Sequence, residues 1–226
     1  MEFLTSPARP ESSTRLRLAQ GLVLLFHVTG FLGLAFSADQ AFYLKYTPLT
    51  LLLTAGLLAA FQPQRNWYFW LFLVQAFMLG FAAEFVGVQT HMLFGSYHYG
   101  PTLGWQWAEV PWLIGLNWAV LTYLAGMLAA YLPVPWWARV LAGAVLMVGF
   151  DLCLEPVAEQ LGFWEWAGHL VPLKNFRDWF LLALLQQLLF VRAGFVKHNQ
   201  LVPLVYLVQL LFFFGLSWLD LDWLLG

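Results

Sequence analysis

The stretch WYFWLFLVQAFMLGFAAEFVGV, residues Trp67–Val88, decides the fold class of this chain. It is long enough to cross a lipid bilayer as one helix, which takes about 20 apolar residues. Its one charged side chain is Glu84, near its end. A charged group at the bilayer centre costs about 2.5–3.5 kcal/mol on insertion scales, so an acid within a membrane helix predicts a functional site.

The rest of the chain has the same apolar character. Of its 226 residues, 62% are hydrophobic and 10% are charged, whereas a soluble domain is about 25% charged. Helices of about 20 residues with short loops between them use nearly the whole length. The composition therefore predicts an all-α polytopic membrane bundle without a separate soluble catalytic domain. Basic residues are too few and too scattered for a nucleic-acid partner.

Seven apolar stretches are expected to form transmembrane helices. They are Leu18–Phe36, Tyr46–Phe61, Trp67–Val88, Pro111–Tyr131, Trp136–Leu154, Trp179–Phe195 and Leu201–Leu219. The second is short, and the count falls to six if it does not cross the bilayer. We therefore expect an N-terminal tail over residues 1–17, one membrane-embedded catalytic domain over 18–219 and a short C-terminal tail over 220–226.

The basic residues of the short loops predict how the bundle is oriented, because lysine and arginine are enriched on the cytoplasmic side. With the N-terminus inside, Lys45, Lys174 and Arg177 lie on the outer side, and the other seven of the 10 basic residues lie on the inner side. This distribution favours a multi-pass protein of the cell membrane with a cytoplasmic N-terminus.

Two further acids occupy positions like that of Glu84. Asp151 and Glu155 lie near the end of the fifth stretch, four residues apart, and therefore share one helix face. Pro156 is expected to end that helix. Because the third and fifth stretches both run outward, the three acids should gather at one membrane face, beside the two longest loops.

Grouped carboxyl groups in a dry site suit acid–base chemistry. A protonated acid can donate a proton, and its ionised neighbour can later accept one. The structural alternative is that these acids cap helix ends or pair with Lys174 or Arg177. The two long loops, residues 89–110 and 155–178, are rich in aromatic residues, glycine and proline, which indicates folded, re-entrant or interfacial segments.

A metal site is not expected from the remaining polar residues. His91 and His98 are seven residues apart and form no HxxxH or HxxH pair, as a helical metal site would need. The single cysteine, Cys153, cannot form an internal disulfide or a cysteine-based metal site. Asn175 is expected to cap the following helix or to hold a water molecule. Asn117 is expected to bond a neighbouring helix.

A set of short motifs follows in order along the middle of the chain. These are Glu84-x-x-Gly87, Phe94-Gly95-x-Tyr97-x-Tyr99, Val110-Pro111, Asp151-x-x-x-Glu155-Pro156, Gly162-x-Trp164-x-Trp166, Pro172-x-x-Asn175 and Trp179. Their order and spacing resemble those of the integral-membrane carotenoid biosynthesis proteins. That family includes the carotenoid hydratases that act on γ-carotene, lycopene and bisanhydrobacterioruberin. The resemblance covers Phe81 to Phe180.

The resemblance implies a cofactor-independent hydratase that adds water to the terminal isopropylidene double bond of an acyclic or monocyclic carotenoid. Asp151 would donate the proton, and Glu84 and Glu155 would position water or accept a proton. The residues expected to line the substrate site are Tyr97, Tyr99, Trp164, Asn175 and Trp179. The implied partners are the lipophilic carotenoid and the lipid bilayer, with other carotenoid-pathway enzymes as further candidates. No metal or redox cofactor is implied.

Two positions depart from the family pattern. An Asp-Pro pair is commoner where this chain has Glu155-Pro156, and a glycine is commoner where it has Arg177. The first change keeps a carboxylate but extends its reach. The second is expected to alter substrate fit or side-chain pairing at the mouth of the site.

Other functions remain open from the sequence. A carotenoid end-group cyclase also begins by protonating an alkene, but its cation is captured by an internal double bond. A proton-coupled transporter would use acids as a relay, although these acids gather at one face instead of spreading across the membrane. A retinal-binding protein is disfavoured, because Leu201–Leu219 contains no lysine for a Schiff base. A purely structural subunit is a further alternative.

Overall fold

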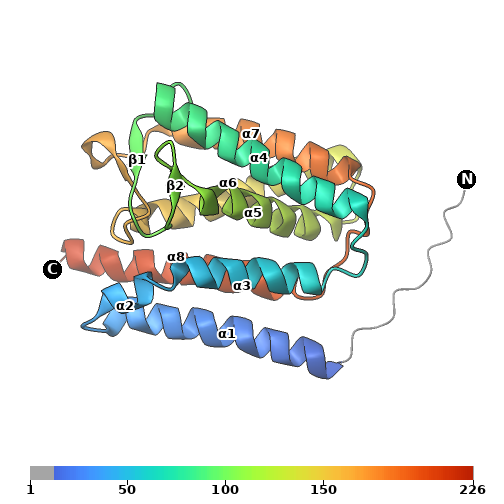
Figure 1. Ribbon diagram of the computed structural model, residues 1–226, viewed down its shortest axis with the longest axis horizontal. Coiled ribbons are helices and arrows are strands. Elements are labelled where there is room, and N and C mark those ends of the chain that lie inside the picture. Colours follow the sequence, from blue (N-terminus) through green and yellow to red (C-terminus); the bar gives the residue numbers. More distant parts are fainter. Residues whose placement is uncertain (1–12, 226) are drawn as a thin grey trace, which may run out of the picture.

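The computed structural model describes residues 13–225, and side chains up to residue 219 (Figure 1). The helices are α1 Ser13–Phe36, α2 Gln40–Leu44, α3 Thr47–Ala60, α4 Trp67–Thr90, α5 Trp112–Ala130, α6 Trp136–Ala158, η1 Ala167–His169, α7 Leu173–Arg192 and α8 Val202–Leu225. The strands are β1 Tyr97–Tyr99, β2 Gln106–Trp107, β3 Val110–Pro111 and β4 Trp164–Trp166. Residues 1–12 of the expected N-terminal tail lie outside the described part.

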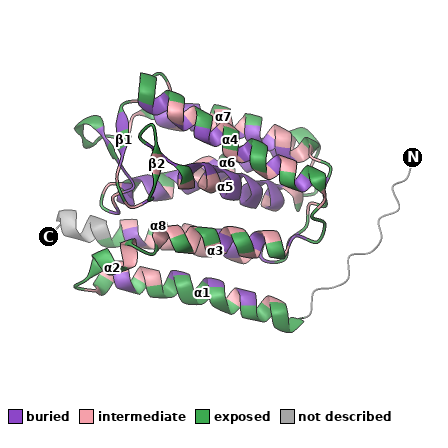
Figure 2. Ribbon diagram, viewed as in Figure 1, coloured by how far each residue is buried: buried purple, intermediate pink, exposed green. Residues whose placement is uncertain are grey.

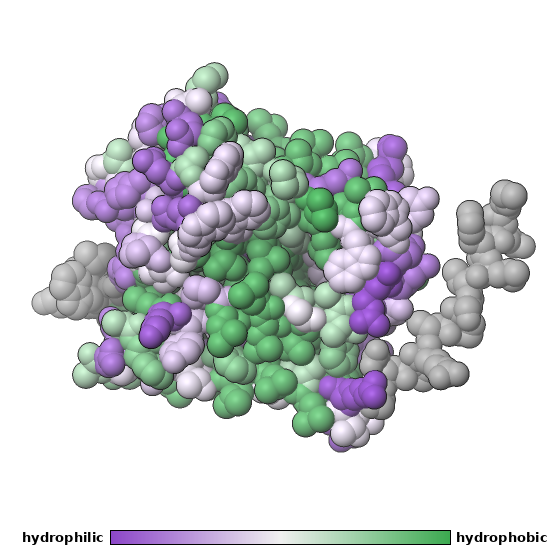
Figure 3. Space-filling model, in the orientation of Figure 1, coloured by the Kyte–Doolittle hydropathy of each residue, from purple (hydrophilic) through white to green (hydrophobic). Residues whose placement is uncertain are grey.

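Six helical segments of the described residues are long and apolar enough to cross a membrane. They are Ser13–Phe36, Gln40–Ala60, Trp67–Thr90, Trp112–Ala130, Trp136–Ala158 and Val202–Leu219. Figure 3 shows apolar side chains over the middle of the molecule and hydrophilic ones gathered toward its two ends. The expected all-α polytopic bundle is therefore confirmed, and the chain is a multi-pass membrane protein.

Helix α7, which corresponds to the expected span Trp179–Phe195, is not among these six segments because its composition is more polar. It nevertheless lies beside the other long helices. At its start, Lys174 Nζ donates to the carbonyl of His91 at 3.1 Å, and just beyond its end the Val196 amide donates to Gln64 Oε1 at 3.1 Å. These partners follow and precede α4, so α7 runs the length of the bundle. It begins at Leu173, ahead of the expected Trp179.

Four polar residues of α7 face inward, which explains how this helix fits an apolar bundle. Asn175, Asp178, Gln186 and Gln187 are buried. Gln186 Nε2 donates to the Ala76 carbonyl of α4 at 3.1 Å. Gln187 Nε2 similarly bonds the Thr122 carbonyl of α5 at 3.0 Å. Such interhelical hydrogen bonds satisfy amides that lipid could not.

Two details differ from the expected spans. The second expected stretch, Tyr46–Phe61, corresponds to α3, and it is preceded by the short helix α2, which was not expected. Asp39 Oδ1 caps α2 by accepting from the Phe42 amide at 3.1 Å. Helix α6 does not end at Pro156, because Pro156 lies inside it and the helix continues to Ala158. A proline removes one backbone donor, and in the last turn this loss does not stop the helix.

Helix α5 forms the centre of the bundle, and most of its residues are buried (Figure 2). Helix α4 approaches it closely at Gly80, where an added Cβ would lie 2.3 Å from the Cβ of Trp118. Helix α1 lies at the opposite edge, against α8, α2 and α3, and its outer face is exposed. The acid-bearing helices α4 and α6 thus belong to the tightly packed half of the molecule.

The two long loops meet at one end of the bundle, as the sequence analysis predicted. Strand β1 pairs with β4 in antiparallel register, with Tyr97 opposite Trp166 and Tyr99 opposite Trp164. These short strands were not expected. Successive side chains of a strand point to opposite faces, so the four aromatic residues are buried together and His98 and Glu165 are exposed.

Candidate active site

Glu84 is buried between α4, α5 and β1 and accepts three hydrogen bonds. Its Oε2 accepts from the Tyr97 hydroxyl at 2.5 Å and from the Tyr99 hydroxyl at 2.7 Å. Its Oε1 accepts from Trp118 Nε1 at 2.8 Å. The alternation along β1 brings both phenols to this carboxyl group. Three donors around one carboxyl group stabilise its ionised form.

Glu155, in the last turns of α6, has an equivalent ring of donors. Its Oε2 accepts from Trp164 Nε1 at 3.0 Å and from Trp166 Nε1 at 2.9 Å. Its Oε1 accepts from Asn175 Nδ2 at 2.8 Å. Both indoles come from β4, so the pairing of the two loops completes the surroundings of both acids.

Asp151 is fully buried, one helical turn before Glu155, and has far fewer partners. Its Oδ2 accepts from Asn175 Nδ2 at 3.2 Å. Its Oδ1 is buried and has no hydrogen-bond partner among residues 13–219. Asn175 therefore bridges Asp151 and Glu155, and it does not cap α7, where Pro172 occupies the N-cap position.

A small cavity lies between Glu84 and Glu155. Its volume is about 20 Å³, and Glu84, Glu155 and Asn175 are among its lining residues. A cavity needs roughly 10–15 Å³ to hold one water molecule and must offer it polar partners. This cavity meets both conditions. Asp151 is not part of its lining and lies behind Asn175.

The three acids make no ion pair within the described residues. Lys174 bonds the carbonyl of His91, and Arg177 pairs with Asp178 at 2.7 Å between Nη2 and Oδ1. The structural alternative, in which Lys174 or Arg177 neutralises the acids, is therefore wrong. Buried carboxyl groups without a countercharge are costly, so their grouping makes this end of the bundle the candidate active site.

Arg177 and Asp178 fix the neighbouring loop. Asp178 Oδ2 accepts from the Phe94 amide at 2.9 Å, while its Oδ1 accepts from the Arg177 guanidinium. Phe94 lines the small cavity. Arg177, which departs from the family pattern, thus takes part in a side-chain pairing beside the site.

The two phenols remain protonated over the ordinary pH range. Burial raises the pKa of Tyr97 well above 10, and the nearby Glu84 carboxylate raises it further. The same two causes, in the same order, raise the pKa of Tyr99. Both hydroxyl groups therefore act as hydrogen-bond donors to Glu84, and neither is suited to donate its proton outright.

All eight site residues expected from the sequence lie at this end of the bundle. Trp179 lines the cavity and stacks on Trp118, with ring centroids 3.9 Å apart. Two donors were not among them, namely Trp118 and Trp166. Trp166 stood in the motif that carries the resemblance, whereas Trp118 gave no signal beyond lying in the same span as Asn117.

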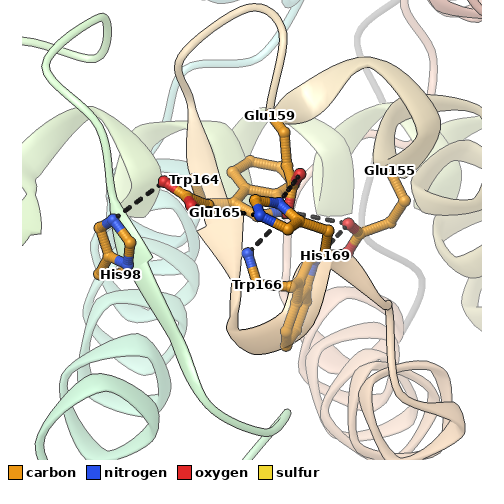
Figure 4. A network of polar contacts seen from close by, with 7 residues as sticks. All are labelled: His98, Glu155, Glu159, Trp164, Glu165, Trp166 and His169. Atoms are coloured by element: carbon orange, nitrogen blue, oxygen red, sulfur yellow. Dashed lines mark hydrogen bonds and ion pairs between the residues drawn. The ribbon is translucent and has the colours of Figure 1, made fainter.

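The outer side of β4 carries a second polar network (Figure 4). Glu159 Oε1 accepts from the Trp166 amide at 2.8 Å, and its Oε2 contacts His169 Nδ1 at 3.0 Å. Glu165 lies 3.4 Å from His98 Nε2. The hydrogen bond with Glu159, followed by the charges of Glu159 and Glu165, raises the pKa of His169. This network holds β4, whose indoles contact Glu155.

Fold and site together define a multi-pass membrane protein with a buried, aromatic-lined carboxyl site. The family model described as carotenoid biosynthesis protein matches residues 46–223. This is most of the chain and includes every residue of the site, so the chain belongs to the carotenoid biosynthesis protein family. Comparisons with curated proteins and with solved structures found no match.

Proposed function

We propose that the protein is a carotenoid hydratase that adds water to the terminal isopropylidene double bond of an acyclic or monocyclic carotenoid. The observation that carries the proposal is the cavity of about 20 Å³ between Glu84 and Glu155. It has room for one water molecule. Membership of the carotenoid biosynthesis family supports the substrate class, because such substrates are apolar and dissolve in the bilayer.

The first step of the proposed reaction is protonation of the alkene. The π electrons of the terminal double bond form a C–H bond at the CH carbon, and the carbon that bears the two methyl groups becomes a tertiary cation. The sequence assigns the donor to Asp151. Since Asp151 lies behind Asn175 and Glu155 lines the cavity, we assign donation to the Asp151–Glu155 pair, with Asp151 as the resting holder of the proton.

The surroundings of Glu84 and Glu155 favour the cation. Each carboxyl group accepts hydrogen bonds from three donors, which stabilise its ionised form once its proton has left, so that a carboxylate can face the cation across the cavity. Aromatic faces add roughly 0.5–2 kcal/mol each when they contact a cation, and Trp164, Trp166 and Trp179 line the cavity. The charge that develops in the transition state meets groups that are already oriented.

Capture of the cation completes the reaction. The oxygen of the held water forms a C–O bond to the tertiary carbon, and one water proton passes to a carboxylate. The product is a tertiary alcohol, and the enzyme regains the proton that it donated. Glu84 is the proposed acceptor, because its position across the cavity from Glu155 separates acid and base. The proton then returns from Glu84 to the Asp151–Glu155 pair, which restores the donor for the next turnover.

Product analysis tests this function. The chain would be expressed in bacteria that accumulate lycopene or γ-carotene. The pigments would be separated by chromatography, and their molecular masses would be measured by mass spectrometry. A hydratase yields a more polar pigment heavier by one water. An isomer of unchanged mass would identify a cyclase, and unchanged pigments with the protein present in the membrane would contradict carotenoid hydration.

The cellular placement is part of the same proposal. We infer a protein of the cell membrane with a cytoplasmic N-terminus, from the seven inner and three outer basic residues among the 10 in the chain and the positive-inside rule. The acids would then open toward the outer face. Other enzymes of the carotenoid pathway are the proposed neighbours, because their substrates and products share the bilayer.

A further inference from the structure

A second, larger cavity adjoins the acid site. Its volume is about 120 Å³, and it lies among α1, α3, α5, α6 and α8. Its walls are mainly apolar, with Phe150 from α6 and Phe212 and Phe213 from α8 among them. Phe26 of α1 belongs to the lining and is exposed, so the cavity reaches the outer surface of the bundle beside α1.

The two cavities share part of their walls. Ile114, Asn117 and Trp164 line both. Among residues 13–219, no hydrogen bond of the Asn117 side chain is found, so it does not bond a neighbouring helix as the sequence suggested. Its free amide lies where the apolar cavity meets the acid cavity.

The sizes of the cavities decide where an alkene can react. A space of about 20 Å³ holds one water molecule, whose share of liquid volume is about 30 Å³. It cannot hold that water and an isopropylidene group together. The end group must therefore remain in the larger cavity, with its double bond at the shared wall.

We propose that this larger cavity binds the isoprenoid chain next to the reacting end group, and that the chain enters past α1. The inference rests on the proposed hydratase function for the reaction, but the binding site itself is defined by shape and polarity. A flexible apolar chain enters from the bilayer, meets apolar walls and brings one end to Asn117 and Trp164.

A third hollow offers a comparison that supports this assignment. It lies among α3, α4 and α5, has a volume of about 270 Å³ and is lined by residues such as Ala55, Leu73 and Leu116. It shares no lining residue with the acid cavity. Size alone would favour this groove, but a chain bound there could not present its end to Glu155.

Helix α1 contributes Phe26, His27, Gly30 and Leu34 to the larger cavity. It precedes residues 46–223, which the family model matches. His27 Nδ1 donates to the Val23 carbonyl at 2.8 Å, which leaves Nε2 as the free ring nitrogen. The wall that the chain passes is therefore the part of the molecule that lies outside the matched region, and α1 is the place where substrate choice can differ.

Gly30 allows a direct test of the cavity. A Cβ at Gly30 would have Phe212 Cε2 as its nearest neighbour at 3.5 Å, an ordinary contact, so Gly30→Leu fills the cavity without forcing the backbone. Gly21→Leu is the matched control on the same helix, because no atom lies within 4 Å of its added Cβ. Ala55→Phe fills the third hollow instead.

Each full-length variant would be purified from lycopene-accumulating bacteria, and the bound pigment per protein would be measured by absorbance. We expect Gly30→Leu to lower bound pigment at least about tenfold, while Gly21→Leu and Ala55→Phe match the wild type. Adding Phe212→Ala to Gly30→Leu should restore binding, because it removes the ring beside residue 30. Size-exclusion profiles would confirm that each variant is folded.

The outcomes separate the two proposals. Equal pigment on wild type and Gly30→Leu, no pigment on any variant, or a loss confined to Ala55→Phe would overturn the binding site. Bound lycopene that is sensitive to Gly30→Leu but never gains water would retain the site and refute the hydratase function. Absence of rescue by Phe212→Ala would also count against the cavity.

Discussion

The two adjoining cavities have linings of opposite polarity. Around the smaller, Glu84 and Glu155 each accept three hydrogen bonds, and the donors come from four separate segments of the chain. Around the larger, aromatic and aliphatic side chains dominate, and Asn117 is without a partner within residues 13–219. The smaller cavity holds hydrogen-bond donors that are already oriented toward charged groups, whereas the larger cavity provides mainly non-directional apolar contacts.

In the proposed reaction, catalysis belongs mainly to the acids and their donors, whereas substrate binding belongs mainly to the apolar walls of the larger cavity. Preorganised dipoles act on the charge that develops during reaction, whereas apolar walls bind substrate and transition state alike. Changes to the acid wall should therefore lower the rate of product formation and leave bound pigment in place. Changes to the apolar wall of the larger cavity should lower the amount of bound pigment and leave the chemical step of the bound substrate unchanged.

The largest expected effect follows from replacing the acids of the smaller cavity and its surroundings. Asp151→Asn and Glu84→Gln should each lower product formation at least about a hundredfold, because positioned acids and bases contribute roughly 10²–10⁴-fold. Bound lycopene per protein should not change. Product would be measured by chromatography and mass spectrometry. Asp39→Asn is the matched control at an exposed helix cap, and full activity of either acid variant would remove that acid from the reaction.

The next effect tests how rigidly the acid wall is held. Gly80→Ala would place a Cβ 2.3 Å from the Cβ of Trp118, and overpacking of this kind costs about 1–3 kcal/mol. Because Trp118 donates to Glu84, both the thermal unfolding midpoint and the activity should fall. Gly56→Ala, with no atom within 4 Å of its Cβ, should leave both unchanged. Equal midpoints for the two variants would contradict the close α4–α5 contact.

A smaller effect concerns the donors of Glu155. Trp164→Phe and Trp166→Phe each remove one N–H group, and a hydrogen bond to a charged group contributes about 1.5–3 kcal/mol. Each variant should lower product formation about tenfold. Trp105→Phe is the control, since Trp105 is exposed at 70%. If all three variants behave alike, indole donation to Glu155 has no role in the reaction.

The smallest effect lies outside both cavities, at His169. The pKa of His169 is raised by the hydrogen bond with Glu159. The imidazole therefore binds its proton more tightly in the folded state than in the unfolded state. This stabilisation is fully present below the unfolded pKa of about 6.5 and is lost as the pH rises through the folded value. His169→Ala should slightly lower the unfolding midpoint at pH 5.5 and leave it unchanged at pH 8.5, as measured by thermal scans. A larger loss at alkaline pH would refute this coupling.

Much of the fold was predictable, because membrane helices can be recognised in a sequence by their length and hydropathy. Helix α7 is predicted only in part, because its expected start is Trp179 and it begins at Leu173. Its polar residues Asn175, Asp178, Gln186 and Gln187 are buried, and hydropathy cannot distinguish an inward polar face from a water-exposed end. The strands β1 and β4 could not be foreseen either, because three-residue strands depend on a partner more than 60 positions away in the sequence.

The acids of the site were predictable because a lone charge in an apolar run is rare and costly. Four of their six donors were among the residues that the resemblance implied, but two were not. The chain has 13 tryptophans, so no single indole stands out, and Trp118 and Trp166 are identified as donors only when α5 and β4 are placed beside the acids. The expectation for Asn117 was wrong for the same reason, since sequence does not reveal which side of a central helix faces a cavity.

The most direct test of the central claim follows the oxygen atom. Membranes that contain the wild-type chain would be incubated with lycopene in water labelled with heavy oxygen, without dioxygen, and the pigments would be analysed by mass spectrometry. The account predicts a tertiary alcohol that carries the label, and no such product with Asp151→Asn. An unlabelled product, or a product that forms only with dioxygen, would contradict hydration at this site.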